Sequence, residues 1–259
     1  MVKPRFLILR VAGTNCDQET QWALEMVGAK TERVHLNEFI TRRKNLSDYD
    51  GLVLPGGFSY GDDIAAGKVL ANQLTYRLRD DLLAFVDQRK PVIGICNGFQ
   101  ALVKSAFLPG GSTLQQATLA WNDSGRFEDR WVYLKVEPSI CPFTRGLPEM
   151  IRLPVAHAEG KFMVKHKKLL ESLERRRQIA FRYVTPAGEI GGYPYNPNGS
   201  VAGIAGICNP TGTVLGMMPH PERAVLREHY PDWLREEELV NDWNPAGWLI
   251  FRNVVNYVS

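Results

Sequence analysis

The sequence predicts an α/β fold with a doubly wound, mostly parallel sheet and flanking helices. In its first half, short apolar runs that stop at glycine or proline alternate with segments whose apolar residues recur at helical spacing. In its second half, the strand-like runs lie closer together and turn-forming residues separate them, so this half is expected to be mixed or antiparallel. Because no repeat or linker interrupts the chain, residues 1–259 are expected to form a single domain.

The expected elements alternate regularly along the chain. In the first half we expect helices at residues 18–26 (capped by Asp17), 69–88 and 97–105, and strands at residues 6–11, 30–35, 51–54 and 91–96. In the second half we expect a last helix at residues 245–257, turns at 186–189 and 196–199, and strands at 131–136, 179–184, 201–207 and 214–218. The charged and aromatic residues 227–243 are expected to form an inserted helical excursion.

The composition argues against several classes of function. The 259 residues include 31 basic and 28 acidic side chains, a formal net charge of +3, so the sequence indicates no basic face for nucleic acid. The apolar run at residues 6–9 is too short for a signal peptide or a membrane span. We therefore expect a cytoplasmic protein that binds neither nucleic acid nor membrane.

The four cysteines, Cys16, Cys96, Cys141 and Cys208, are scattered and form no C-x-x-C pair. This spacing argues against a disulfide framework and against a zinc site, so no metal is expected. In a reducing compartment each cysteine is either a small buried side chain or a reactive thiol.

Cys96 occupies a turn between an expected strand and an expected helix. The stretch Gly94-Ile-Cys96-Asn97-Gly98 has the spacing of a nucleophile elbow, with cysteine in the place of serine. Small flanking residues let the strand and helix approach, and the helix N-terminus favours a thiolate. The N–H of Asn97 could hold an oxyanion. The motif alone leaves a second interpretation open, a buried structural cysteine in a turn.

A thiolate nucleophile needs a proton shuttle, and His220 is the strongest candidate among the five histidines. It follows the expected strand at residues 214–218, and Pro219 and Pro221 on either side of it fix the backbone. Glu222 could orient the imidazole by accepting its second N–H, as the third member of a catalytic triad does.

Two overlapping glycine-rich stretches follow the strand at residues 51–54. Residues 55–62, Pro-Gly-Gly-Phe-Ser-Tyr-Gly-Asp, could turn backbone N–H groups toward a reacting oxygen, although an ordinary turn explains this loop taken alone. Residues 61–69 do not form a phosphate-binding loop, because five residues separate the glycines where a Walker loop has four, and Val69 replaces the Mg²⁺-binding Ser or Thr. No ATP site is expected in this chain.

Together these residues resemble the class I, triad-type glutamine amidotransferases, whose fold is flavodoxin-like. The closer similarity is to the family of glutaminase subunits of phosphoribosylformylglycinamidine synthases. The stretches that carry it are residues 13–17 (Gly-Thr-Asn-Cys-Asp), 55–67, 96–100, 156–160 and 219–223. The resemblance implies a nucleophile, a base with its orienter, two oxyanion donors and a group of substrate-binding residues. The implied nucleophile is Cys96, the base is His220 with Glu222 as its orienter, and the oxyanion donors are Gly57 and Asn97. Gln100 is implied to bind glutamine, and Ser59, His157 and Glu159 are implied either to bind glutamine or to contact the synthetase.

The resemblance also implies a function. This chain would hydrolyse glutamine to glutamate and ammonia for a large synthetase subunit, which makes formylglycinamidine ribonucleotide with ATP and Mg²⁺ in purine biosynthesis; a small third subunit is expected as well. No cofactor is implied for this chain itself. Three alternatives compete with this function: a glutaminase serving a different synthetase, a cysteine hydrolase of the related peptidase and chaperone group, and a non-catalytic glutamine-sensing module. The long match at residues 55–67 disfavours the first two, and the intact Cys96, His220 and Glu222 set disfavours the third.

Overall fold

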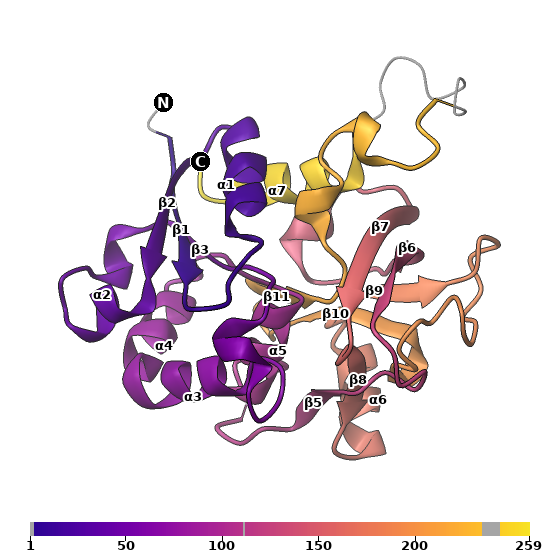
Figure 1. Ribbon diagram of the computed structural model, residues 1–259, viewed down its shortest axis with the longest axis horizontal. Helices are drawn as coiled ribbons and strands as arrows, with labels where there is room; N and C mark the ends of the chain where they lie inside the picture. Colours follow the sequence, from indigo (N-terminus) through magenta and orange to yellow (C-terminus); the bar gives the residue numbers. More distant parts are fainter. Residues whose placement is uncertain (1–2, 111, 235–243) are drawn as a thin grey trace.

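The computed structural model describes residues 3–110, 112–234 and 244–259 (Figure 1). Its centre is a nine-stranded sheet with the strand order β2-β1-β3-β4-β11-β10-β9-β6-β7, and a smaller sheet pairs β5 with β8. Within the described ranges, none of the helices has the length and apolar character that crossing a membrane requires.

Five neighbouring strands form the parallel half of the sheet, which confirms the predicted doubly wound arrangement. Their order across the sheet follows the flavodoxin-like pattern. In that order they are β2 (Lys30–His35), β1 (Arg5–Arg10), β3 (Gly51–Leu54), β4 (Val92–Ile95) and β11 (Val214–Met217). The last three strands are buried at every position, because helices cover both faces of a parallel sheet.

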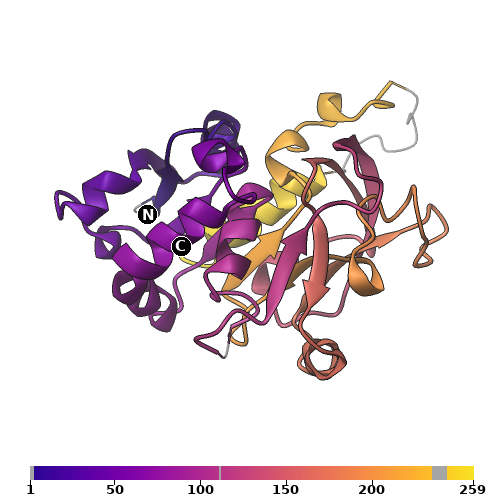
Figure 2. The same ribbon diagram turned by 60° about the horizontal axis from the view of Figure 1, so that its bottom comes forward.

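The helices lie on both faces of this half (Figures 1 and 2). On one face α1 (Asp17–Met26) packs against β1, β2 and α7 (Ala246–Asn256). On the other face α5 (Asn97–Lys104) packs against β3, β4 and β11, with α3 (Lys68–Arg77) beside it and α4 (Arg79–Asp87) beyond. A short helix, α2 (Leu36–Ile40), follows β2.

Two local expectations in this half were wrong. The single helix expected at residues 69–88 is broken into α3 and α4 at Leu78, whose φ of −129° is not helical and whose side chain is buried in the core. Asp17 does not cap α1, because it is the first residue of the helix and its carboxylate forms ion pairs with Arg10 at 2.7 Å and Arg33 at 3.2 Å.

The second half of the sheet is antiparallel, as predicted, and lies beside the parallel half (Figure 2). Its strands in order across the sheet are β10 (Ile204–Cys208), β9 (Ile179–Val184), β6 (Glu128–Val136) and β7 (Met150–His157). Four elements were not predicted: β7 of this sheet, the strands β5 (Ala117–Ala120) and β8 (Lys161–Val164) of the smaller sheet, and the helix α6 (Lys167–Arg175). β7 contains Pro154, a residue that sheets tolerate mainly at their edges, and β7 is an edge strand.

The excursion expected at residues 227–243 is described only in its first part. Arg227–His229 forms a single turn of 3-10 helix rather than a longer helix. Residues 235–243 lie outside the described residues.

Gly98 sets how closely α5 approaches the sheet, because a Cβ at this position would lie 1.9 Å from the carbonyl oxygen of Leu54. We expect Gly98→Ala to lower the free energy of unfolding by about 1–3 kcal/mol or more, since backbone on both sides must move apart. Urea unfolding measures this change. Gly192→Ala is the matched control, because its Cβ would meet nothing within 4 Å. Equal stability of the two variants would contradict this account of the α5 packing.

Candidate active site

Cys96 lies between β4 and α5, at the carboxyl edge of the parallel strands. Its backbone has φ 49° and ψ −103°, a left-handed conformation that costs a residue with a side chain about 1–3 kcal/mol. The neighbouring glycines make this turn possible, since a Cβ on Gly94 would lie 2.8 Å from the backbone of Gly98. The strained strand–turn–helix context that the spacing predicts is therefore present.

His220 and Glu222 follow β11, the strand next to β4, so they reach the same edge of the sheet as Cys96. His220 Nδ1 lies 2.6 Å from Glu222 Oε1, and both side chains are almost fully buried. His220 Nε2 has no hydrogen-bond partner among the described residues. It is the ring nitrogen left for the thiol of Cys96, whose own hydrogen bond goes to the carbonyl of Ala156 at 3.6 Å.

The surroundings of His220 favour its charged form. Burial alone lowers the pKa of the imidazole, but the negative charge of Glu222 and, after it, that of an ionised Cys96 outweigh burial and raise the pKa well above its usual value. A proton leaving Cys96 therefore has an acceptor that is stabilised in its protonated state.

Gly57 and Asn97 offer backbone N–H groups near the thiol. Asn97 is the first residue of α5, where N–H groups have no partner within the helix. The hydrogen bonds on either side of Gly57 tie this loop to residues 13–16, whereas the Gly57 N–H donates to none of the described residues. Gly57 has φ 139° and leaves no room for a Cβ, which would lie 2.8 Å from the Gly13 carbonyl oxygen. Both N–H groups are available to an oxyanion.

A cavity of about 270 Å³ contains Cys96. This volume is a little below the range of about 300–1,000 Å³ typical of drug-sized ligands, and it suits a substrate as small as an amino acid. The residues around it are Gly57, Phe58, Gly61, Asp62, Ala66, Gln100, Trp121, Ala156, His157, Ala158 and Glu159. A larger cavity, of about 480 Å³, lies around Asp123 and Tyr193 and is lined by no residue of the proposed triad.

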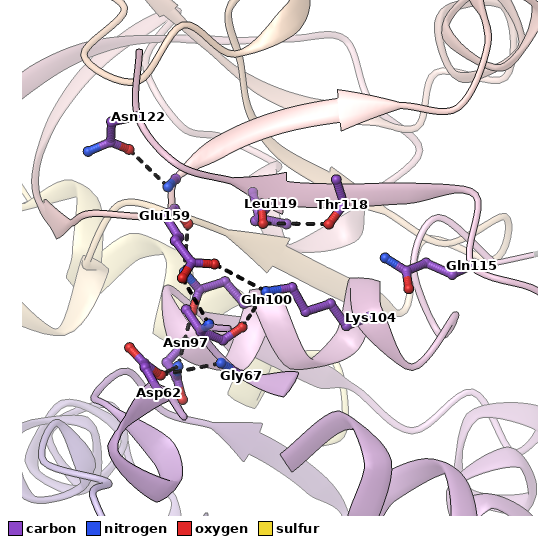
Figure 3. Close-up of polar contacts among 12 residues, drawn as sticks. Asp62, Gly67, Asn97, Gln100, Lys104, Gln115, Thr118, Leu119, Asn122 and Glu159 are labelled. Carbon is purple, nitrogen blue, oxygen red and sulfur yellow. Dashed lines mark hydrogen bonds and ion pairs between the residues drawn. The ribbon is translucent and has the colours of Figure 1, made fainter. Parts of the chain in front are cut away.

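Beside this cavity a network that starts at the side chain of Asn97 and continues through Gln100 joins three segments of the chain (Figure 3). Asn97 Nδ2 donates to Asp62 Oδ1 at 2.9 Å and to Gln100 Oε1 at 3.0 Å. Its Oδ1 accepts from the N–H of Ser59 at 3.2 Å. Gln100 Nε2 in turn donates to the carbonyl of Glu159 at 2.6 Å. These bonds hold the start of α5 to the loop after β3 and to the turn after β7.

The carboxylate of Glu159 has partners for both of its oxygens. Oε1 accepts from the N–H of Ala66 at 3.1 Å, and Oε2 forms an ion pair with Lys104 Nζ at 3.3 Å (Figure 3). Lys104 Nζ also donates to the carbonyl of Ala66 at 2.6 Å. Burial lowers the pKa of Lys104, and the nearby charge of Glu159 opposes that shift. The pair braces the wall of the cavity.

The predicted substrate-binding residues therefore divide into two groups. Gln100, His157 and Glu159 line the cavity that contains Cys96, whereas Ser59 does not line it and its buried hydroxyl has no hydrogen-bond partner among the described residues. The His157 ring contacts Asn122 Oδ1 at 3.2 Å. Burial, helped by the charge of His220, lowers the pKa of His157 to about 3, so this imidazole is neutral.

Sequence reasoning missed two residues at this site, although both lie in stretches that it quoted. Asp62 lines the cavity. Cys16 lies beside the proposed triad: its sulfur, a His220 ring nitrogen and a Glu222 oxygen lie within 4.8 Å of one another. Burial raises the pKa of Cys16 to about 11, so this thiol stays neutral. The guanidinium of Arg223, 3.3 Å from its sulfur, disfavours a cation there.

A cysteine at a strained elbow and a histidine–glutamate pair, at the carboxyl edge of a doubly wound sheet, define a triad-type cysteine amidohydrolase. The sequence model of the CobB/CobQ-like glutamine amidotransferase domain matches residues 3–258. The chain is 45% identical to phosphoribosylformylglycinamidine synthase subunit PurQ of Treponema denticola, and the match covers 99% of this chain and 100% of the relative. The chain belongs to the glutamine amidotransferase family of PurQ subunits.

Further comparisons agree. The PurQ subunit of Dehalococcoides mccartyi is 42% identical over 99% of this chain and 98% of its own. Among solved structures, a chain of PurLQS from Thermotoga maritima is 32% identical, with a TM-score of 0.74 and full coverage of both chains. The glutaminase domain of Trypanosoma brucei CTPS, at 14% identity and a TM-score of 0.56 over 99% of this chain and 95% of that one, shares the fold.

Replacing Glu222 tests how the imidazole is charged. Glu222→Gln removes the negative charge that raises the pKa of His220. The imidazolium is present below this pKa and is lost as the pH rises through it, so the variant loses the imidazolium at a lower pH than the wild type does. We expect kcat/KM for glutamine to fall roughly 10²- to 10⁴-fold, and its alkaline limb to move to lower pH. A pH profile of glutamate release measures both effects. Glu228→Gln, at an exposed position, is the control. An unshifted alkaline limb would contradict this role.

Proposed function

We propose that this chain is the glutaminase subunit of a phosphoribosylformylglycinamidine synthase and that Cys96, His220 and Glu222 are its catalytic triad. The observation that carries the proposal is the buried contact between His220 and Glu222 next to the strained Cys96 turn, at a cavity suited to an amino acid. The full-length similarity to PurQ subunits supports the choice of synthase.

The arrangement supports a covalent mechanism in two stages. The Cys96 thiolate attacks the side-chain amide carbon of glutamine, and the N–H groups of Gly57 and Asn97 hold the oxyanion of the tetrahedral intermediate. His220 then protonates the departing nitrogen, which gives ammonia and a glutamyl thioester. Water, deprotonated by the same imidazole, attacks the thioester and releases glutamate. Glu222 keeps the imidazole oriented through both stages.

The ammonia has to be used elsewhere, so we propose that this chain works in a cytoplasmic complex. A large synthetase subunit would activate the acceptor with ATP and Mg²⁺, and a small third subunit would complete the assembly. The similarity to a chain of PurLQS from Thermotoga maritima supports this view. Ammonia is protonated and lost in water, so we expect the subunits to dock with a closed passage between them.

Removing the nucleophile tests the chemistry. We expect Cys96→Ala to reduce glutaminase activity to background, because no other described thiol lines the cavity. Glutamate release by the complex is the measurement. A glutamine-like chloroketone should alkylate Cys96 in the wild type, as detected by mass spectrometry. Cys141→Ala, which removes a buried thiol outside this cavity, should keep the activity. Turnover by Cys96→Ala would disprove the proposed nucleophile.

The synthetase should also control the glutaminase. We expect the isolated chain to hydrolyse glutamine slowly, because the Cys96 thiol here bonds to the Ala156 carbonyl while His220 Nε2 has no partner among the described residues. Adding the synthetase subunits should raise the rate and support glutamine-dependent amidation of phosphoribosylformylglycinamide with ATP. Full turnover by the isolated chain would contradict this dependence.

A further inference from the structure

Asp62 contributes a carboxylate to the cavity that contains Cys96. It is held in a left-handed conformation, φ 54°, in the loop after β3. Its Oδ1 accepts from Asn97 Nδ2 at 2.9 Å and from the N–H of Gly67 at 3.3 Å (Figure 3). Its Oδ2 accepts no hydrogen bond from the residues that the structure describes. One oxygen is therefore fixed by the protein, and the other is left for a ligand.

The second carboxylate at this cavity, Glu159, is in a different state. Its two oxygens are taken by the Ala66 N–H and by Lys104, so its charge is neutralised within the protein. No Lys, Arg or His of the described ranges forms an ion pair with Asp62. Of the two acids, Asp62 is the one that no cation contacts directly, because Lys104 pairs with Glu159 and its charge reaches Asp62 only as a weaker effect.

Burial raises the pKa of Asp62, so its ionised form is disfavoured until a cationic ligand supplies the opposite charge. A primary ammonium group does so with three N–H donors, which suits one open carboxylate oxygen. The substrate in the proposed function is an amino acid, and its α-ammonium is such a group. We propose, on the basis of that function, that Asp62 binds the α-ammonium of glutamine and so makes the site select free glutamine over amides that lack the amino group.

The network around Asp62 explains how this contact would help the reaction. Asn97 bonds to Asp62 through its side chain, and its own N–H lies next to Cys96, where the oxyanion forms. The group that holds the ammonium end and the group that faces the reacting carbonyl thus belong to one hydrogen-bonded unit. An amide bound without the Asp62 contact would lack this fixed distance to the thiol.

The test compares two substrates that differ only in the amino group, L-glutamine and glutaramate. The wild-type complex should hydrolyse glutamine with a kcat/KM roughly 10²-fold or more above that for glutaramate. In Asp62→Asn, which keeps the size of the side chain, the value for glutamine should fall by a similar factor while that for glutaramate changes little. The preference for glutamine should then largely disappear. Asp63→Asn, an exposed neighbour in the same loop, should keep the wild-type preference.

Two results would overturn the proposal. One is an Asp62→Asn complex that loses activity toward both substrates to the same extent, which would make Asp62 a support for Asn97 only. The other is a variant that keeps the wild-type preference. A wild-type complex inactive toward glutamine would instead refute the proposed function. In that event, calorimetric titration of glutamine and of glutaramate into Cys96→Ala, with and without Asp62→Asn, still tests the subsite. Loss of the acid must weaken the binding of glutamine but not that of glutaramate.

Discussion

The close packing of α5 on the parallel strands is the constraint on which the site depends. With no side chain at Gly98, the helix backbone can lie against the Leu54 carbonyl, and the turn that leads into the helix has the left-handed conformation of Cys96. The same helix then presents Asn97, Gln100 and Lys104 toward the cavity wall, at the spacing of successive helical turns. One backbone contact thus places the thiol, an oxyanion donor and the bracing network together.

The antiparallel half of the sheet completes the site from the other side. In its edge strand β7, the Pro154 carbonyl accepts a hydrogen bond from the backbone N–H of His220, 2.8 Å away, and the Ala156 carbonyl accepts one from the Cys96 thiol. The turn after β7 supplies the Glu159 carbonyl that holds Gln100. The two sheet halves therefore meet at the proposed nucleophile and the proposed base, and neither half contains all of the proposed site.

This division explains what could be predicted from the sequence. The parallel half was predictable because continuous apolar runs and glycine punctuation mark buried strands locally, and the Cys96 elbow lies within one such unit. β7 was missed although its buried positions alternate as in a half-buried strand, because Pro154 inside the run counts against a strand. The break at Leu78 was missed because burial of that side chain in the core overrides the local helical pattern. Asp62 could not be singled out from the sequence, because no local pattern shows that Glu159 is already paired with Lys104.

The segment after β1 links these parts in a way that the proposed mechanism does not use directly. The N–H of Cys16 donates to the Gly56 carbonyl at 3.3 Å, and the N–H of Phe58 donates to the Gly13 carbonyl at 2.9 Å, so residues 13–16 hold the loop that carries the Gly57 oxyanion donor. The Cys16 thiol lies beside His220, and Arg223 ties it to α1 through Glu19. One short loop therefore contacts both the oxyanion loop and the base. The stretch Gly-Thr-Asn-Cys-Asp at residues 13–17 thus fixes the Gly57 loop relative to His220, the groups to which the proposed mechanism assigns the negative charge and the proton.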